Sequence, residues 1–405
     1  MLSSKLPAIL VFALTYVGIA LGGVPWLRID RTGIALLGAA LMLVIGALTP
    51  EEAYRAIDLH TLALLTGMMI VVAHLKVSGV FRALSAAIVA PVHSGRILLV
   101  IVTGVTGILS AFLVNDAICL VMAPLGIEIA RRLGRDPIPY LLAVATASNL
   151  GSVATITGNP QNMIIGVTSA IPYGTFAAVL APVAGFGLLV VVAVVGLTHR
   201  HEFLRPLSRE TARVKVRLHR GQAIKAVLVT LCLVIAFFAG VPVSEAAIVA
   251  GAMLLVTRGV KPQRIYREID GSLLLMFAGL FVVVAGFERV IVTPGLIAEV
   301  NRVGLDVPWR LTLVTAALSN LVSNVPAVLV LKPFVAGLPD PTRSWLVIAM
   351  SSTLAGNLTL LGSVANLIVA EKARAEGIYL TFGAYLRVGL PVTILSIGFG
   401  AWWLA

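Results

Sequence analysis

The chain has 405 residues, of which 59% are hydrophobic and only 12% are charged, with a net charge of +12. Soluble domains are about 45–50% apolar and about 25% charged, so this composition excludes an ordinary soluble protein. Nucleic-acid binding is not expected, because no basic stripe is interleaved with aromatics and cytoplasmic loops of membrane proteins collect Lys and Arg. Cys119 and Cys232 lie in apolar runs, which predicts neither a disulfide framework nor a metal site.

The first half contains apolar stretches long enough to span a bilayer as helices, which takes roughly 17–25 residues. The apolar run at the N-terminus is too long for a signal peptide and has no clear small-residue cleavage site, so we expect a retained helix. The predicted elements are ordinary spans at 6–25, 33–48, 61–76 and 175–197, a re-entrant hairpin at 97–130 that turns at 114–116, and a broken span at 137–168.

The second half repeats this order after a basic segment at 199–220, which carries seven Arg and Lys side chains against two Glu. We expect this segment to be a cytoplasmic linker by the positive-inside rule, with a regulatory or partner-docking role as the alternative. The chain then divides into a first repeat at 1–198 and a second at 221–405. The second repeat is predicted to have ordinary spans at 222–240, 244–258, 271–290 and 383–404, a hairpin at 308–335 and a broken span at 344–372.

The two halves match one another, with an offset that drifts slowly along the chain. Hydrophobic matches alone would be explained by chance, but polar, Gly and Pro matches recur here in the same order, which predicts an internal duplication. Three pairs of segments superpose, at offsets of 212, 209 and 204 residues: Pro50–Asp58 on Pro262–Asp270, Ser110–Pro124 on Ser319–Pro333, and Thr155–Ile165 on Thr359–Val369.

The predicted topology is inverted between the repeats. A hairpin returns to its own side, so each half crosses the bilayer about five times and the chain has about ten transmembrane helices plus two re-entrant hairpins. Because five is odd, the halves insert with opposite orientation, and both termini are expected on the extracytoplasmic side. Four arginines then fall on the outer side, against the positive-inside rule: Arg289, Arg302, Arg310 and Arg343.

Polar residues within apolar spans are costly and mark functional sites in membrane proteins. Four clusters lie at repeat-related positions, two at the hairpin turns and two in the broken spans. Helix packing is the alternative for an isolated Ser or Thr, but four repeated clusters rich in Asn favour a binding site. The candidate substrate- and ion-binding residues are Asn115, Asp116, Ser148, Asn149, Thr155, Thr157, Gly158, Asn159, Asn162, Ser323, Asn324, Asn357, Thr359, Gly362, Ser363 and Asn366.

The broken spans have a physical role in this prediction. A continuous helix through Asn159 is unfavourable because Pro160 removes a backbone donor and restricts the residue before it. Unwound backbone at membrane depth is tolerated only inside protein or beside a wet cavity. There it leaves N–H groups that attract anions and carbonyls that coordinate cations, so paired interruptions predict a transport site where the two repeats meet.

Asp116 is the only acidic residue in these clusters, and its repeat mate is Val325. A charged Asp at the bilayer centre costs roughly 2.5–3.5 kcal/mol on insertion scales, so it is expected to be paired with a cation, hydrated or neutral. This asymmetry predicts a single coupling ion, H⁺ or Na⁺, with Asn115, Asp116 and Asn162 as the candidate Na⁺ ligands. The alternative is that the turn reaches an aqueous vestibule, where Asp116 is merely solvated.

At these clusters the sequence resembles a known group of transporters. Residues 113–125, LVNDAICLVMAPL, are similar to the N-D hairpin motif of arsenite permeases and related sodium–proton antiporters. Their second hairpin and two broken helices resemble residues 319–331, 157–166 and 356–377. The resemblance covers essentially the whole chain and points to the ion transporter superfamily, which also holds divalent anion–sodium symporters and citrate transporters.

This resemblance implies a homodimer in which a scaffold domain fixes the dimer and a transport domain moves like an elevator. The hairpins read Val-Asn-Asp and Ser-Asn-Val where dicarboxylate symporters carry Ser-Asn-Thr, which argues against carboxylate and two-sodium coupling. The positions that match the family's site, and would lie near substrate or ion, are Asn115, Asp116, Asn149, Asn162, Asn324, Asn357 and Asn366.

The sequence predicts a secondary active transporter of a small inorganic anion or oxyanion, arsenite among the candidates, coupled to H⁺ or Na⁺. We expect it in a bacterial or archaeal cytoplasmic membrane. It has no phosphate-binding glycine loop and no hydrolase motif in a span, so neither an enzyme nor a cofactor is expected. The rival functions are a Na⁺/H⁺ antiporter that uses Asp116, a passive channel, and the membrane subunit of a pump with a separate ATPase.

Overall fold

The computed structural model describes residues 2–22, 28–89, 94–204, 219–256, 259–293, 295–296 and 304–405. These residues are mostly helical and include no β-strand. Most of the predicted linker at 199–220 lies outside the described residues, which stop at 204 and resume at 219. Among them, six helices are long and apolar enough to cross a membrane: α4 (Leu59–Ser78), α6 (Gly95–Phe112), α10 (Tyr173–Thr198), α12 (Arg220–Phe238), α15 (Gly271–Ile291) and α21 (Phe382–Trp403).

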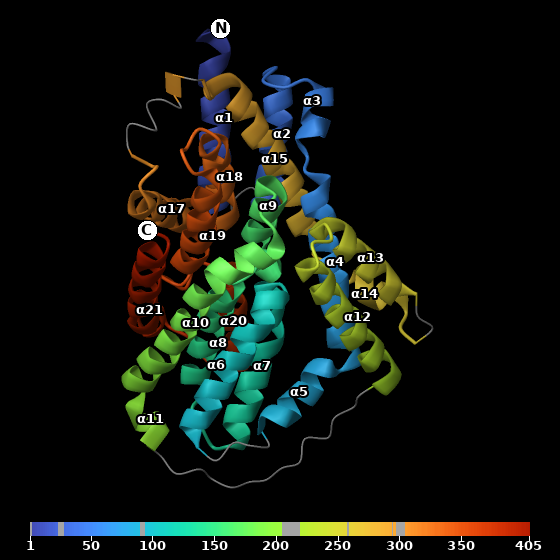
Figure 1. Ribbon diagram of the computed structural model, residues 1–405, viewed down its shortest axis with the longest axis vertical. Helices are drawn as coiled ribbons and strands as arrows, with labels where there is room; N and C mark the ends of the chain where they lie inside the picture. The colour runs from blue at the N-terminus through green and yellow to red at the C-terminus, as the bar shows by residue number, and fades with distance from the viewer. Residues whose placement is uncertain are drawn as a thin grey trace.

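One set of helices, called here the scaffold group, contains the first three spans of each repeat. Figure 1 shows α4 and α12 along one side of the molecule, together with α13 and the short α14. Helix α2 packs on α15, and α13 packs on α4, so the repeats are interleaved within this group. Besides α4, α12 and α15, its members are α1 (Leu2–Ala20), α2 (Arg31–Val44) and α13 (Val243–Leu255), with the connecting helices α3 (Pro50–Ala56) and α14 (Pro262–Tyr266).

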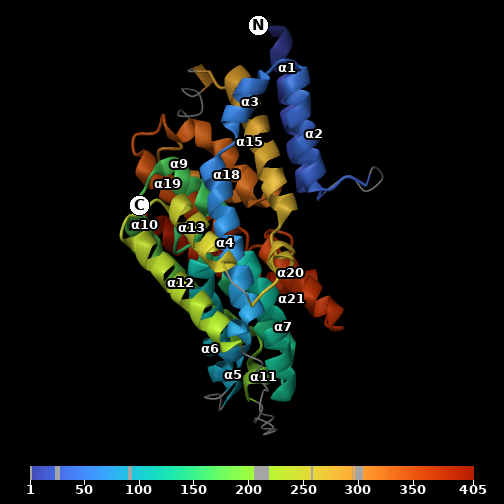
Figure 2. The ribbon, with the colours of Figure 1, turned by 90° about the vertical axis from the view of Figure 1, so that its right-hand side faces the viewer.

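The remaining helices form the hairpin group, named for its two hairpins. Figure 2 shows α6 and α7 at the opposite end of the molecule from α1 and α2. Helix α5 (Val80–Val89), which the sequence did not predict, follows α4 after a turn at Gly79 with φ 87°. Besides α6, α10 and α21, the hairpin group consists of α7 (Asn115–Arg132), α8 (Pro137–Ser152), η2 (Ile156–Gly158), α9 (Pro160–Ser169), α11 (Arg200–Leu204), α17 (Pro308–Val322), α18 (Asn324–Val335), α19 (Pro341–Ala355) and α20 (Val364–Ala375).

Two reciprocal glycine contacts show the internal symmetry of the scaffold group. A Cβ placed on Gly67 would lie 2.4 Å from the backbone of Ala247, and one on Gly279 would lie 2.8 Å from the backbone of Ala35. Gly67 and Gly279 are 212 residues apart, as are Ala35 and Ala247. Each repeat therefore supplies the glycine of one contact and the alanine of the other. The backbones approach so closely at both sites that no side chain larger than that of glycine fits there.

The hairpin group shows the same exchange. Helix α7 packs on α20 of the other repeat, and the equivalent α18 packs on α9. Likewise α8 packs on α20 and the equivalent α19 packs on α9, while α10 packs on its own counterpart α21. These reciprocal contacts are those of a pair of repeats related by a twofold axis, so the predicted all-α fold with two repeats and broken helices is confirmed.

Candidate functional site

The hairpin turns and the helix breaks meet around one central cavity of about 60 Å³. Four helices begin at its wall, namely α7, α9, α18 and α20. The scaffold group closes the cavity through α1, α2 and α15. The lining residues are Ile19, Arg31, Asn115, Asp116, Pro160, Gln161, Leu273, Met276, Phe277, Ser323, Asn324, Val325, Pro326, Ser363 and Val364.

The starts of these helices carry few side-chain caps. No side-chain cap bonds are made at the starts of α7, α18 and α20, whereas Asn159 caps α9 by accepting from the Asn162 backbone N–H at 2.9 Å. Uncapped N–H groups at a helix start carry a partial positive charge and attract anions. The cavity wall is therefore electropositive at three uncapped helix starts, which come from both repeats.

The second hairpin turns at a strained residue. Ser323 has φ 77° and ψ 160°, a backbone region that side chains other than glycine rarely adopt. Its neighbour Asn324 is held by Ser319, whose Oγ donates to the Asn324 Oδ1 at 2.6 Å and lies 2.8 Å from the Ser352 carbonyl oxygen. The hydrogen bonds of Ser319 thus hold the strained turn in place. Strained backbone that its surroundings hold in place is often found at binding sites.

Two buried asparagines hold the helix breaks open in the same way. The Nδ2 of Asn162 donates to the carbonyls of Ser152 and Thr155 at 3.1 and 3.0 Å. The Nδ2 of Asn366 donates to the carbonyls at the equivalent positions of its own break, Gly356 at 2.8 Å and Thr359 at 3.1 Å. Each amide replaces the N–H groups that the break has removed from the helix, so the carbonyls remain satisfied inside the protein.

The two breaks are also joined to each other by reciprocal bonds. The Nδ2 of Asn159 donates to the Oγ1 of Thr353 at 3.2 Å, and the Oγ of Ser363 donates to the Oδ1 of Asn149 at 3.0 Å. Asn159 and Ser363 are 204 residues apart, as are Asn149 and Thr353. The contact is therefore made twice, once from each repeat, and it fixes the two broken helices against one another.

Asn149 connects the first hairpin to the second broken helix. The Nδ2 of Asn115 donates to the Asn149 Oδ1 at 3.0 Å, and the Asn149 Nδ2 donates to Asn357 and Asn366 at 2.8 and 3.1 Å. The buried Oδ1 atoms of Asn115 and Asn162 have no hydrogen-bond partner. An unpaired buried acceptor is costly, and of these two residues Asn115 lines the cavity, so its oxygen is the one that a substrate donor could satisfy.

Some of the predicted binding residues line the central cavity and others do not. Asn115, Asp116, Ser323, Asn324 and Ser363 line it. Behind it, Asn149, Asn159, Asn162, Asn357 and Asn366 form the bonded layer just described. The remaining six do not line it: Ser148, Thr155, Thr157, Gly158, Thr359 and Gly362.

These six residues support the backbone of the breaks. Thr157 Oγ1 bonds the hydroxyl of Tyr173 at 2.8 Å, and Ser148 Oγ accepts from the Cys119 thiol at 2.9 Å. A Cβ on Gly158 would lie 2.2 Å from the Ser152 carbonyl oxygen, so only glycine fits there. Sequence pattern alone does not separate such supporting hydroxyls from those that face the cavity.

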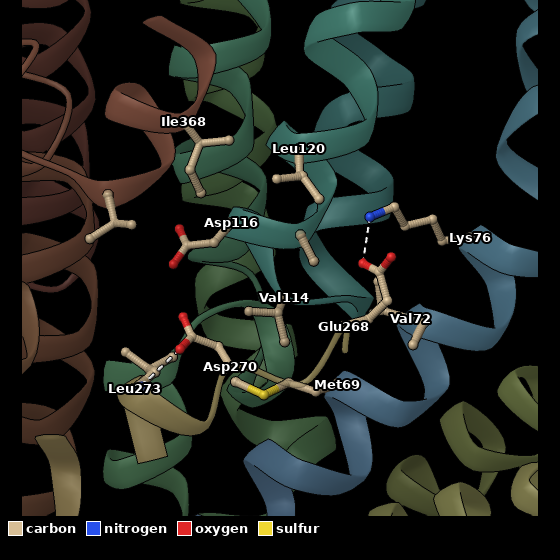
Figure 3. Close-up of a pocket in the computed structure, with 13 residues that line it drawn as sticks. Met69, Val72, Lys76, Val114, Asp116, Leu120, Glu268, Asp270, Leu273 and Ile368 are labelled. Carbon is tan, nitrogen blue, oxygen red and sulfur yellow. Dashed lines mark hydrogen bonds and ion pairs between the residues drawn. The ribbon is translucent and has the colours of Figure 1, made fainter. Parts of the chain in front are cut away.

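Asp116 lies between the central cavity and a second one, called here the lateral cavity, of about 200 Å³. Figure 3 shows the carboxylates of Asp116 and Asp270 on facing sides of the lateral cavity, with the Lys76–Glu268 ion pair beside them. The Oδ1 of Asp270 also caps α15 by accepting from the Leu273 N–H at 3.0 Å. Asp116 is thus accessible from a space between the scaffold and hairpin groups.

The predicted Na⁺ ligands Asn115 and Asn162 form their hydrogen bonds with different partners. Asn115 bonds Asn149, whereas Asn162 bonds the backbone of its own break. Within the described part of the chain, no group of three or more His, Cys, Asp or Glu residues could hold a metal ion. Sodium binding by Asn115, Asp116 and Asn162 stays a prediction.

Several lining residues were not among the predicted site residues. Arg31 and Gln161 line the central cavity, where the Nε2 of Gln161 donates to the Thr353 Oγ1 at 3.1 Å. Asp270, the repeat mate of Asp58, lines the lateral cavity. A comparison of repeat mates would have found Arg31, because the position 212 residues later is Val243.

Comparisons with known proteins agree with this architecture. Residues 16–346 match the family model described as citrate transporter. The chain is 32% identical to the silicon efflux transporter of Oryza sativa subsp. japonica, covering 93% of each protein, and 25% identical to the putative transporter arsB of Dictyostelium discoideum, covering 92% of this chain and 87% of that one.

A solved structure gives the same fold. The YdaH transporter of Alcanivorax borkumensis superposes with a TM-score of 0.61 at 17% sequence identity, covering 100% of this chain and 97% of that one. At this identity the likeness concerns the fold. Together with the family match, it confirms the predicted relationship to the ion transporter superfamily, and the chain belongs to the citrate transporter family as an integral membrane transporter.

Proposed function

We propose that the chain is a secondary active transporter of a small inorganic oxyanion or hydroxo acid in the cytoplasmic membrane, coupled to protons through Asp116. The observation that carries this proposal is the convergence of four helix starts and the unpaired Oδ1 of Asn115 on one small cavity. Such a site offers donors to oxygen atoms and acceptors to hydroxyl groups, which is what a hydroxylated oxyacid requires.

The size of the cavity supports a small substrate. A volume of about 60 Å³ has room for roughly four to six water molecules, taking about 10–15 Å³ for each. That space suits a single central atom with its oxygens and is small for a tricarboxylate such as citrate. The relative named for silicon efflux supports the same class, because dissolved silicon is a small hydroxylated acid.

Movement of the hairpin group against the scaffold group is the transport step that we propose. The central cavity lies at the boundary between them, with Arg31 and Phe277 on the scaffold side and both hairpin turns opposite. The close contacts at Gly67 and Gly279 hold the scaffold helices tightly against one another. We therefore expect the hairpin group to slide along the scaffold group at the boundary between them. We propose that the scaffold group also holds a second copy of the chain in a homodimer.

Transport by the purified chain in proteoliposomes tests this function. With a proton gradient imposed, we expect silicic acid or arsenite to accumulate against its own gradient, and a protonophore should abolish the accumulation. Equilibration without accumulation would indicate a passive channel. A requirement for an added ATPase and ATP would indicate a pump subunit. Dissipation of the proton gradient by Na⁺ alone, without oxyacid, would indicate a Na⁺/H⁺ antiporter.

A further inference from the structure

Arg31 lines the central cavity from the scaffold side. It is the first residue of α2, directly after the capping residue Asp30, and its side chain is partly buried. No described residue forms a hydrogen bond or ion pair with its guanidinium. Arg28, in the same connection, is exposed and does not line the cavity. The position of Arg31 therefore differs from that of an ordinary loop arginine.

Arg31 and Asp116 are the only charged side chains among the described residues that line the central cavity. Both stand where the second repeat has valine, because Arg31 is 212 residues before Val243 and Asp116 is 209 residues before Val325. The asparagines and helix starts around the cavity occur in both repeats. The duplicated framework is thus nearly symmetric, while both charges come from the first repeat.

The formal charges of the residues that line the central cavity sum to zero, since Arg31 contributes +1 and Asp116 contributes −1. Four helix starts add further partial positive charge. An uncharged guest gains only hydrogen bonds there, whereas an anion also interacts with the Arg31 guanidinium, which pairs with no carboxylate in the described part of the chain. The guanidinium is a rigid fork of N–H donors, a geometry that fits two oxygens of one oxyanion.

We propose that Arg31 is the specificity-determining residue of the central cavity and selects an oxyanion by a forked contact to two of its oxygens. This inference rests on the proposed function and adds a preference to it: among oxyacids, those that carry a negative charge bind more tightly than uncharged ones. Because Arg31 belongs to the scaffold group, the contact is lost when the hairpin group carries the substrate away.

Binding to the purified full chain in detergent tests the proposal, read as a rise in melting temperature and as Kd by calorimetry. Selenite and arsenate serve as anionic probes; silicic and arsenous acids serve as uncharged probes at neutral pH. The variants are Arg31→Gln, Arg31→Lys and the matched control Arg28→Gln. Hydrogen bonds to charged groups contribute about 1.5–3 kcal/mol, so we expect Arg31→Gln to weaken anion binding about tenfold to a hundredfold.

Arg31→Lys should bind the anions with intermediate Kd, because it keeps the charge and loses the fork. Arg28→Gln should bind like the wild type, and uncharged probes should bind all four proteins alike. Anion binding unchanged in Arg31→Gln would overturn the role of Arg31 and leave the proposed function standing. Wild-type protein that binds only the uncharged acids would have the same meaning. No response of the wild type to any probe would overturn both proposals.

Discussion

The side-chain amide of Asn149 donates to the Oδ1 of Asn366 at 3.1 Å, which joins the broken helix of one repeat to that of the other. The same amide nitrogen donates to Asn357, and its oxygen accepts from Asn115 and Ser363. All of these side chains are buried. One asparagine thus satisfies four polar groups that come from a hairpin and from both ends of a helix break.

Replacing Asn149 with Ala is expected to destabilise the protein and abolish transport, because it leaves several buried polar groups without partners. Each such group costs about 1–3 kcal/mol, so the melting temperature should fall markedly. Asn149→Asp keeps the acceptor contacts and loses the donor contacts, and its effect should be intermediate. Scanning fluorimetry in detergent measures this, with the exposed Gln263→Ala as the control. An unchanged melting temperature in Asn149→Ala would contradict a stabilising role for the hydrogen bonds that Asn149 forms behind the cavity.

Asp116→Asn is expected to abolish proton-coupled accumulation of substrate while the protein stays folded. The side chain keeps its shape, so the packing of α7 is retained, but it no longer gains or loses a proton. Accumulation in proteoliposomes as a function of external pH is the measurement. Asp58→Asn provides the control, since Asp58 caps α4 as Asp270 caps α15 and does not line either cavity. A pH profile of Asp116→Asn identical to that of the wild type would rule out its role as proton carrier.

Gly67→Ala is expected to destabilise the scaffold group. The added Cβ would lie 2.4 Å from the backbone of Ala247, so the helices α4 and α13 must separate. Overpacking of this kind costs about 1–3 kcal/mol. In Gly104→Ala, where a Cβ would meet nothing within 4 Å, helix propensity should leave stability unchanged or slightly higher. Equal melting temperatures for the two variants would refute the close packing.

Glu52, in α3 outside the membrane-spanning helices, should make stability depend on pH. Its carboxylate accepts from the Thr49 backbone N–H at 2.8 Å and pairs with Arg289, and the Thr49 bond is the larger cause of its lowered pKa. A lowered pKa contributes stability above the ordinary value of 4.5, and that stability is lost as pH falls through the lowered pKa.

The expected result is that Glu52→Gln flattens the acid side of the melting-temperature profile below about pH 4.5. Glu51→Gln, in the same first turn of α3 and exposed, is the matched control and should follow the wild type. If the melting temperatures of Glu52→Gln and Glu51→Gln fall in parallel as the pH is lowered, Glu52 does not contribute to the pH dependence of stability.

Much of this architecture is determined by the sequence itself. Pro160 cannot continue a helix, so the break before α9 is a local property of the chain, and the apolar arms beside Asn115 can form only a hairpin of limited length. The repeat follows from the order of matched residues, and the inverted orientation follows from the number of crossings in each half. These features depend on backbone chemistry and on residue order, which a sequence displays directly.

The identity of the cavity-facing side chains was decided by tertiary structure. Thr155 and Thr157 look like binding residues in the sequence, yet they bond the Ala111 carbonyl and the Tyr173 hydroxyl. Arg31 looks like a loop charge, yet it lines the cavity about 85 residues from Asp116 along the chain. Which face of a helix meets a cavity depends on how helices distant in sequence pack against it, because the packing of α2 on α15 orients Arg31 whereas its neighbours in the chain do not.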